Sequence, residues 1–488
     1  MRDMGISDND ERPALPDGLV AFVKQDCPTC VLVAPVLQQL AGSGTCTVIS
    51  QDDPSFPEDA AWVVHDADLS LSWHHQVETV PTLMRVVNGQ PTEQIEGWER
   101  QRWEAFTGVS NLAPELPDFR PGCGSLSVDP TISDQLAVRF SGSVMTSRRV
   151  ELAQLEDEWE AMWDRGWSDG LPVVPPTEAR VLQMLAGTSR PPDEVVAVVA
   201  PDLVECTVEK VAINAVMAGC RPEYLPVVLA AVEAACSDEF NIHGLLATTM
   251  PVGPVLVVNG PIAKQIGMNA GVNVLGQGNR ANSTIGRALQ LVIRNVGGGR
   301  PGGVDRATHG NPAKVGLAFP EDEASSPWTS LAESRGFRAD QSTVTLFPGE
   351  GPRMFVDQIS RSPESLTKHL AQALLSNVSP RLAVQFETLI VLGPEHMARY
   401  RDAGWDRNRF LDELTGHLQI ECDTVLRGVD GIEEGLPPLL AGATIGKFPP
   451  DGIHVVHAGS DAGLFSMIMA GWVTGSIGSV TVTKEIVP

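Results

Sequence analysis

One stretch, in which a buried strand leads through a long loop into an amphipathic helix, constrains the fold of this chain most. Residues 255–258 (VLVV) form an apolar run typical of a buried β-strand. Residues 285–293 repeat apolar side chains at the spacing of one helix face. A strand that leads into a helix is the building unit of an α/β fold, in which both elements share one core. The stretch therefore predicts the α/β class.

The loop between these elements is rich in groups that bind anions. A helix start, expected near Asn282 with Asn282 or Ser283 as its cap, offers unpaired N–H groups and partial positive charge. The Arg280 guanidinium can add two hydrogen bonds to an oxyanion. We expect a small anionic substrate here; the alternative is a capped structural helix after an irregular loop. The candidate binding residues are Asn259, Asn269, Asn273, Gln277, Asn279, Arg280, Asn282, Ser283 and Thr284.

Composition limits the partners and the location of the protein. The 488 residues are enough for two or three domains. A net charge of −26, from 35 basic and 61 acidic side chains, opposes binding to nucleic acid or to an anionic membrane. The sequence has no apolar stretch long enough to span a bilayer and no signal peptide, so we expect a cytoplasmic protein. Eight cysteines in so long a chain do not indicate a disulfide framework.

Near the N-terminus, two cysteines lie between a strand and a helix. Residues 19–23 predict the strand and residues 31–40 the helix, with Cys27-Pro28-Thr29-Cys30 between them. A helix start stabilises a thiolate through its dipole and its free N–H groups, so Cys27 is placed to be reactive. A Cys-x-x-Cys pair can also be half of a zinc site, but the sequence has no second pair to complete one.

Two further motifs follow this pair. Residues 80–82 (VPT) begin a predicted strand at a proline, and residues 88–89 (NG) predict a tight hairpin. In this order, the elements and motifs of residues 17–110 resemble the thioredoxin fold.

The resemblance implies roles for three residues. Cys27 would be the nucleophile, Cys30 would close a redox-active disulfide with it, and Pro81 would be a cis-proline beside them. We expect no metal and no cofactor other than this disulfide, with an external thiol reductant or a thioredoxin reductase as a partner. The chain departs from the family at Asp26, where tryptophan is common. A carboxylate there should raise the pKa of Cys27.

We expect the segments on both sides of this domain to be flexible. Residues 1–16 are an acidic lead-in, and residues 111–149 begin as a proline-rich linker. Cys123 lies in this linker between two glycines, as a relay thiol that must reach two partners would; the alternative is a tolerated linker cysteine. Residues 150–488 then form a larger α/β domain, which could divide near residues 320–350.

The larger domain shows two more strand–loop–helix patterns. Residues 388–392 lead into a predicted helix at 395–403, and residues 453–457 into one at 464–470. Such units argue for a layer of parallel strands. The glycine-rich loop of the second unit contains Asp461, a further candidate for substrate binding.

Two other residues of this domain are candidates for the site. Cys206 lies between Glu205 and Thr207 at an expected helix start, which makes it the second candidate for a reactive thiol. His243 precedes a glycine and is a candidate binding residue, with a structural role as the alternative.

Residues 150–488 also resemble a widespread bacterial family that shares the stretches WSDGLPVVPPT, AGCRPEYLPVVLAA, NRANSTIGRALQLVIRNVGG and VHAGSDAGLF. That resemblance implies no settled activity. Related proteins look like partners of small selenocysteine-Gly-Ser-Cys proteins, which are similar to the selenoprotein subunit of glycine and betaine reductases. This chain lacks the Cys-x-x-Cys that follows the reactive residue in that subunit.

Together these features predict a thiol-dependent oxidoreductase with a fused thioredoxin-like electron donor. It would reductively cleave a carbon–heteroatom bond in a small anionic substrate. Cys123 or Cys206 would react with the substrate, and the Cys27–Cys30 pair would reduce the product through a mixed disulfide. The alternatives are a non-redox lyase or hydrolase whose thiols the first domain keeps reduced, and a binding or assembly protein. The sequence leaves an oligomer open.

Overall fold

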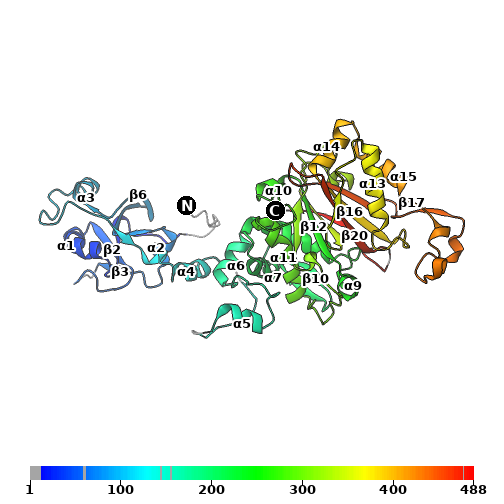
Figure 1. The fold of residues 1–488 in the computed structure, drawn as a ribbon. Coiled ribbons are helices and arrows are strands. Elements are labelled where there is room, and N and C mark those ends of the chain that lie inside the picture. Colours follow the sequence, from blue (N-terminus) through cyan, green and yellow to red (C-terminus); the bar gives the residue numbers. More distant parts are fainter. Residues whose placement is uncertain (1–11, 59–61, 143–144, 154–155, 476, 488) are drawn as a thin grey trace. The chain divides into compact units, whose positions relative to one another are not determined.

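The chain folds into two units, Met1–Ser143 and Val144–Pro488. The structure is a computed structural model, and it describes residues 12–58, 62–142, 145–153, 156–475 and 477–487 (Figure 1). Both units combine helices with sheets that contain parallel and antiparallel strands. The predicted α/β class is therefore confirmed.

The first unit is built on a mixed sheet. In chain order its elements are β1 (Gly18–Val23), α1 (Pro28–Gly42), β2 (Cys46–Ser50), β3 (Val63–His65), α2 (Ser70–His74), β4 (Thr79–Val80), β5 (Thr82–Val87), β6 (Gln90–Glu96), β7 (Trp98–Glu99), α3 (Arg100–Thr107), β8 (Phe119–Arg120), β9 (Cys123–Gly124) and α4 (Ser133–Arg139). The strand order of the sheet is β3-β2-β1-β5-β6. β1, β2 and β3 run parallel, β5 is antiparallel to β1, and β6 is antiparallel to β5.

The central strand and the first helix follow from the local sequence. Residues 19–23 of β1 are all apolar and buried, as expected of a strand that is covered on both faces. α1 begins directly after Cys27, which has extended backbone angles and caps the helix with its sulfur. Pro28 occupies the first helical position, where a missing N–H has no cost. Cys27 is therefore fixed at the junction between the sheet and α1.

The segment after α3 packs on the first unit, although the sequence suggested a free linker. β8 pairs antiparallel with β7, and β9 pairs antiparallel with β4. The indole of Trp98 donates to the carbonyl of Pro117, and the hydroxyl of Ser127 donates to the carbonyl of Val77. Residues 117–128, here called the docked segment, are thus held by backbone pairing at 119–120 and 123–124 and by a side-chain hydrogen bond near each end. Proline and glycine leave such a segment extended, and an extended segment can add a strand to an exposed edge.

Both flanks of this segment also contact the first unit. Before it, Leu112 is fully buried in the core. After it, the ring of Phe140 lies 4.9 Å from that of His74. Residues 1–11 of the predicted lead-in 1–16 lie outside the described residues. In the rest of the lead-in, Leu15 is buried, and its N–H donates to the carbonyl of Gly89.

The second unit is built on a larger mixed sheet. Its elements are α5 (Glu158–Asp164), α6 (Glu178–Leu185), β10 (Val195–Val199), β11 (Val204–Thr207), α7 (Val208–Ala218), α8 (Leu225–Ala235), α9 (Ile242–Ala247), β12 (Gly253–Asn259), α10 (Pro261–Gln265), α11 (Arg280–Asn295), β13 (Leu317–Pro320), α12 (Leu331–Ser334), β14 (Thr343–Gly349), β15 (Arg353–Val356), α13 (Pro363–Leu375), β16 (Phe386–Leu392), α14 (Pro394–Asp402), α15 (Arg407–His417), β17 (Gln419–Glu421), β18 (Thr444–Gly446), β19 (Ile453–His457), β20 (Phe465–Val473) and β21 (Val482–Glu485). The sheet order is β13-β12-β14-β20-β16-β19, with β15 on β20 and β21 on β14. β12 is parallel to β13 and β16 is parallel to β19, whereas the other pairs are antiparallel.

Side chains that alternate along the strands divide the core of this unit between two sets of helices. Leu256 packs with residues of α7, α8 and α11, which are green in Figure 1. Its neighbour Val257 faces the other side and shares a cluster with Val391 of β16. Ile390, next to Val391, packs with residues of α13, α14 and α15. The period of two residues in a strand is what assigns each side chain to its cluster.

One predicted helix of this unit is a strand. Residues 464–470 were expected to form the helix of a second strand–loop–helix unit, but residues 465–470 lie in β20, antiparallel to β16. The run is apolar almost throughout, and periodicity alone does not separate a buried helix from a buried strand in such a run. The expected layer of parallel units is therefore wrong in part, and β16 with α14 is the unit that forms as predicted.

Within the described ranges, no helix has both the length and the apolar character that crossing a membrane requires.

Replacing Gly122 by Ala should loosen the docked segment. A Cβ at this position would lie 2.3 Å from Cγ2 of Thr79 and 2.9 Å from the carbonyl oxygen of Val80, so β9 could not approach β4 as closely. We expect a loss of about 1–3 kcal/mol of local stability, measured as faster amide hydrogen exchange in the peptide that contains Ser125, whose N–H donates to the carbonyl of Glu78. Gly124→Ala is the matched control, because a Cβ there meets nothing within 4 Å. Equal exchange in both variants would show that this close approach does not hold the segment.

Candidate functional site

Cys27 and Cys30 lie at the start of α1, and both are free thiols. The backbone N–H of Cys30 donates to Sγ of Cys27 at 3.3 Å. Sγ of Cys27 also lies 3.5 Å from the carbonyl oxygen of Val80, which precedes Pro81. The Val80–Pro81 peptide bond is cis, the isomer expected from the sequence. Cys27, Cys30 and Pro81, three of the four residues that the sequence singled out in this unit, therefore lie close together.

The docked segment brings a third thiol to this pair. In the pairing of β4 with β9, Cys123 lies opposite Val80, whose carbonyl oxygen lies 3.5 Å from Sγ of Cys27. The hydroxyl of Thr29, between the two cysteines of α1, donates to the carbonyl of Pro121 at 2.7 Å. The sequence had placed Cys123 in a flexible linker, whereas backbone pairing holds it next to Cys27.

Hydrogen bonds decide which of the three thiols is ionised. The hydrogen bond from the Cys30 thiol lowers the pKa of Cys27 to about 5, against the opposing effect of burial, and the Cys123 thiol adds a second such bond. Burial raises the pKa of Cys30, and burial together with the hydrogen bond to Cys27 raises the pKa of Cys123. At neutral pH the cluster therefore holds its negative charge on Cys27. The expected rise in the pKa of Cys27 from Asp26 is wrong, since Asp26 is exposed and solvent screens its charge.

Cys206, the second candidate for a reactive thiol, lies in an apolar environment. It belongs to β11 rather than to a helix start, and α7 begins only after Thr207, which caps it. Its side chain is 0% exposed, and burial raises the pKa of the thiol to about 12. A reactive thiol needs access and a stabilised thiolate. Cys206 has neither.

The asparagine-rich loop of the second unit is bonded mainly to itself. α11 begins at Arg280 with Asn279 as its cap, three residues earlier than Asn282. The Asn282 side chain accepts the N–H of Asn269 at 3.0 Å and donates to the carbonyls of Asn269 and Val274. The Asn279 side chain donates to the carbonyl of Gly267. The structure thus brings Asn269, Asn279 and Asn282 together as braces of the loop.

The remaining loop candidates are arranged in a similar way. Asn273 donates to the carbonyl of Gln277 at 2.7 Å, and the hydroxyl of Thr284 donates to the carbonyl of Arg280. Nε of Arg280 donates to the carbonyl of Gly219 at 2.8 Å. Ser283 is exposed on the first turn of α11. These contacts favour a structural role for the polar side chains, and the anion site stays a prediction.

Three further candidates lie at separate places in the second unit. The Asn259 amide is buried and donates to Glu321 at 2.7 Å and to Glu323 at 2.6 Å, so two carboxyl groups already occupy the position expected for an anion. Burial raises the pKa of Glu321 to about 7. His243 is exposed on α9, and Asp461 is exposed between β19 and β20. The loop of Asp461 does meet the asparagine-rich loop, because the N–H of Gly459 donates to the carbonyl of Ala270.

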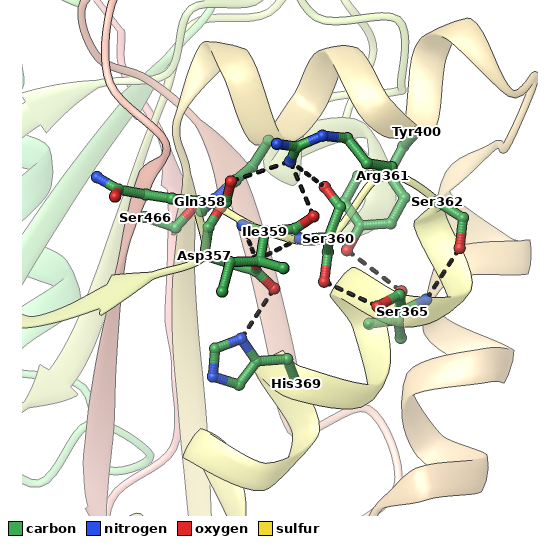
Figure 2. A network of polar contacts seen from close by, with 12 residues as sticks. Asp357, Gln358, Ile359, Ser360, Arg361, Ser362, Ser365, His369, Tyr400 and Ser466 are labelled. Carbon is green, nitrogen blue, oxygen red and sulfur yellow. Dashed lines mark hydrogen bonds and ion pairs between the residues drawn. The ribbon is translucent and has the colours of Figure 1, made fainter.

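A polar cluster around Asp357 was missed by the sequence analysis (Figure 2). Nδ1 of His369 lies 2.8 Å from one carboxylate oxygen of Asp357, and the N–H groups of Ile359 and Ser360 donate to the other. The Asp357 side chain is 3% exposed, whereas that of His369 is 47% exposed. Although burial acts in the opposite direction, hydrogen bonds from Ser360, then from His369 and Ile359, hold the pKa of Asp357 well below its usual range.

This cluster lines a surface pocket of about 460 Å³, which is formed by Val356, Asp357, Gln358, Ile359, Ser360, Ser365, Lys368, His369 and Gln372. Asp357 follows β15 and His369 lies on α13. The two residues form no recognisable motif in the sequence, because only the folding of α13 against β15 brings them together.

The site is identified neither by similarity to known proteins nor by a group of metal-binding side chains among the described residues. No model of a known protein family matches the chain, and no curated protein matches it in sequence. In the part of the chain that the structure describes, no three or more His, Cys, Asp or Glu side chains are grouped so as to hold a metal ion. The candidate site therefore rests on the geometry of the three thiols in the first unit.

The ionisation of Cys27 can be measured directly. We expect the ultraviolet absorbance of its thiolate to fall with a midpoint at about pH 5 as the pH is lowered, because the folded-state pKa lies there. The transition should be absent from Cys27→Ala and present in Cys46→Ala, which removes a buried thiol outside the cluster. A midpoint near the ordinary value for a thiol, about 8.5, would contradict the hydrogen-bond assignment.

Asp357→Asn should destabilise the second unit in a pH-dependent way. The folded-state pKa of Asp357 lies below the unfolded value of about 3.9, so the ionised carboxylate stabilises the fold above that value. This contribution is lost as the pH falls through the folded-state pKa. At pH 7 the variant should lose about 1–3 kcal/mol, measured by denaturant unfolding, and the difference from wild type should shrink below about pH 4. The control Asp340→Asn removes an exposed carboxylate and should change stability little.

Proposed function

We propose that the protein is a thiol–disulfide oxidoreductase whose first unit is a thioredoxin-like module in which Cys27 supplies the thiolate. One observation carries the proposal. Sγ of Cys27 lies at the start of α1, where the N–H of Cys30 donates to it, with a second thiol one helical turn further on. This arrangement lowers the pKa of one thiol and keeps the proton on the other, which is the condition for attack followed by resolution.

The reaction follows from this asymmetry. A cysteine thiolate of the cluster attacks one sulfur of a substrate disulfide; the S–S bond breaks, and the first substrate thiol leaves with a proton. A second cysteine then attacks the mixed disulfide and releases the second substrate thiol. The substrate disulfide gains two electrons, and the enzyme dithiol loses two as it becomes a disulfide. An external thiol reductant or a thioredoxin reductase would restore the dithiol.

The second unit would use the electrons that the cysteines of the first unit supply. A donor on the same chain acts at a high effective concentration, which favours such a fusion. The predicted reaction, reductive cleavage of a carbon–heteroatom bond in a small anionic substrate, stays a prediction from the sequence. Cys206 is not included, since its thiol is buried and protonated. A cytoplasmic location, where thiols stay reduced, agrees with this proposal.

The Asp357–His369 pair favours one alternative, a non-redox lyase or hydrolase. A buried carboxylate that holds Nδ1 of a histidine fixes the ring, so Nε2 is available as a general base. Turnover that does not depend on a thiol reductant and is lost in His369→Gln would select this alternative.

The test of the proposal is the reduction of insulin disulfides by the full chain with dithiothreitol as reductant. Wild type should accelerate the reaction, and Cys27→Ala should reduce the rate to that of the reductant alone, since no other described thiol of the cluster is ionised at neutral pH. Cys46→Ala should keep the wild-type rate, because Cys46 lies outside the cluster. A wild-type protein without acceleration, or a fully active Cys27→Ala protein, would refute the proposal.

A further inference from the structure

In the three-thiol cluster, the reactive sulfur is not the one that solvent reaches. Cys27 and Cys30 are both 0% exposed, whereas Cys123 is partly exposed. Attack on a disulfide requires the incoming sulfur pair to approach the attacking sulfur closely. With the docked segment in place, an external disulfide can approach Cys123 but neither cysteine of α1.

The docked segment is held too firmly for this arrangement to be incidental. On one side of Cys123, Arg120 pairs with Trp98, and the carbonyl of Pro121 accepts the hydroxyl of Thr29. On the other side, the hydroxyl of Ser125 and the N–H of Leu126 bind the two ends of the Gln51 amide.

Direct access to Cys27 would break several of these contacts at once. Gln51, Ser125 and Ser127 are buried polar residues, so their hydrogen bonds are costly to open without replacement. Gly122 adds a close backbone approach to β4. The segment is therefore part of the redox centre rather than a tether that passes over it.

We propose that Cys123 is the thiol that exchanges with external disulfides, and that a transient Cys27–Cys123 disulfide carries the oxidation to the Cys27–Cys30 pair. This inference rests on the proposed function and specifies its entry point. It assigns to Cys123 a catalytic role in the reaction.

The reaction begins at Cys123. Cys123 passes its proton to the Cys27 thiolate, beside which the β4–β9 pairing holds it, and attacks the external disulfide, forming a mixed disulfide and releasing the first substrate thiolate. That thiolate takes the proton from Cys27. Cys27 then attacks Sγ of Cys123, the second substrate thiolate leaves, and the Cys27–Cys123 disulfide forms.

The last exchange is internal. Cys30 passes its proton to the departing substrate thiolate and attacks Sγ of Cys27, which releases Cys123 as a thiolate. That thiolate is reprotonated by solvent. The net change is one substrate disulfide reduced to two thiols and one Cys27–Cys30 disulfide formed, with two electrons transferred.

The first test uses the reduced wild-type chain. A bulky maleimide at a substoichiometric amount should modify Cys123 before Cys27, as mapped by mass spectrometry of the digested protein. Modification of Cys27 first would show that the docked segment opens to admit external reagents, and it would overturn the inference.

The second test uses variants in the insulin assay. Cys123→Ala should lose the disulfide reductase activity, and Cys46→Ala should retain it. A Cys123→Ala rate that equals or exceeds the wild-type rate would show that Cys123 only covers Cys27, which also overturns the inference. If Cys123→Ala does not fold, as judged by circular dichroism, Cys30→Ala decides: on oxidation it should accumulate the Cys27–Cys123 disulfide, and its absence counts against the inference.

These outcomes separate the two proposals. A wild-type protein that is inactive refutes the oxidoreductase function, whatever the labelling order. Activity that is lost in Cys27→Ala but kept in Cys123→Ala leaves the function standing and removes Cys123 from the reaction.

Discussion

The hydrogen bonds that converge on Sγ of Cys27 are the interaction on which the rest of the first unit depends. The backbone N–H of Cys30 donates because Cys27 caps α1, and the neighbouring thiols of Cys30 and Cys123 lower the pKa of Cys27 further. These donors stabilise a buried thiolate, which burial alone would disfavour. The negative charge is thereby confined to one of three neighbouring sulfurs, and the other two thiols keep their protons.

Backbone pairing, rather than side-chain packing, places the third of these sulfurs. β4 and β9 are each only two residues long, yet their pairing sets Cys123 opposite Val80, whose carbonyl contacts Cys27. Gly122 is required at this point because any side chain would collide with Thr79 and Val80. The same contacts that order the docked segment also cover Cys27, so an ordered segment excludes solvent from the Cys27 sulfur.

In the second unit, the polar side chains of the asparagine-rich loop form hydrogen bonds mainly with the loop's own backbone. Asn269, Asn279 and Asn282 satisfy backbone groups that would otherwise be left unpaired around the start of α11. By contrast, Asp357 fixes a partly exposed histidine at the edge of a pocket. An abundance of amides therefore marks a bracing role here, and the more distinctive polar geometry lies where the sequence shows no pattern.

The sequence by itself determined features that depend on neighbours within a few residues. Cys27 and Cys30 lie at one helix start. The apolar runs at 19–23 and 255–258 lie in β1 and β12, because a short continuous apolar run is typical of a buried strand. Only the tertiary structure decided the rest. The place of Cys123, the contact of Asp357 with His369, and the strand at Phe465–Val473 each depend on pairing or packing between distant segments. A local sequence pattern does not predict such distant partners, since the same extended or apolar stretch can pair with any strand edge that the fold leaves open.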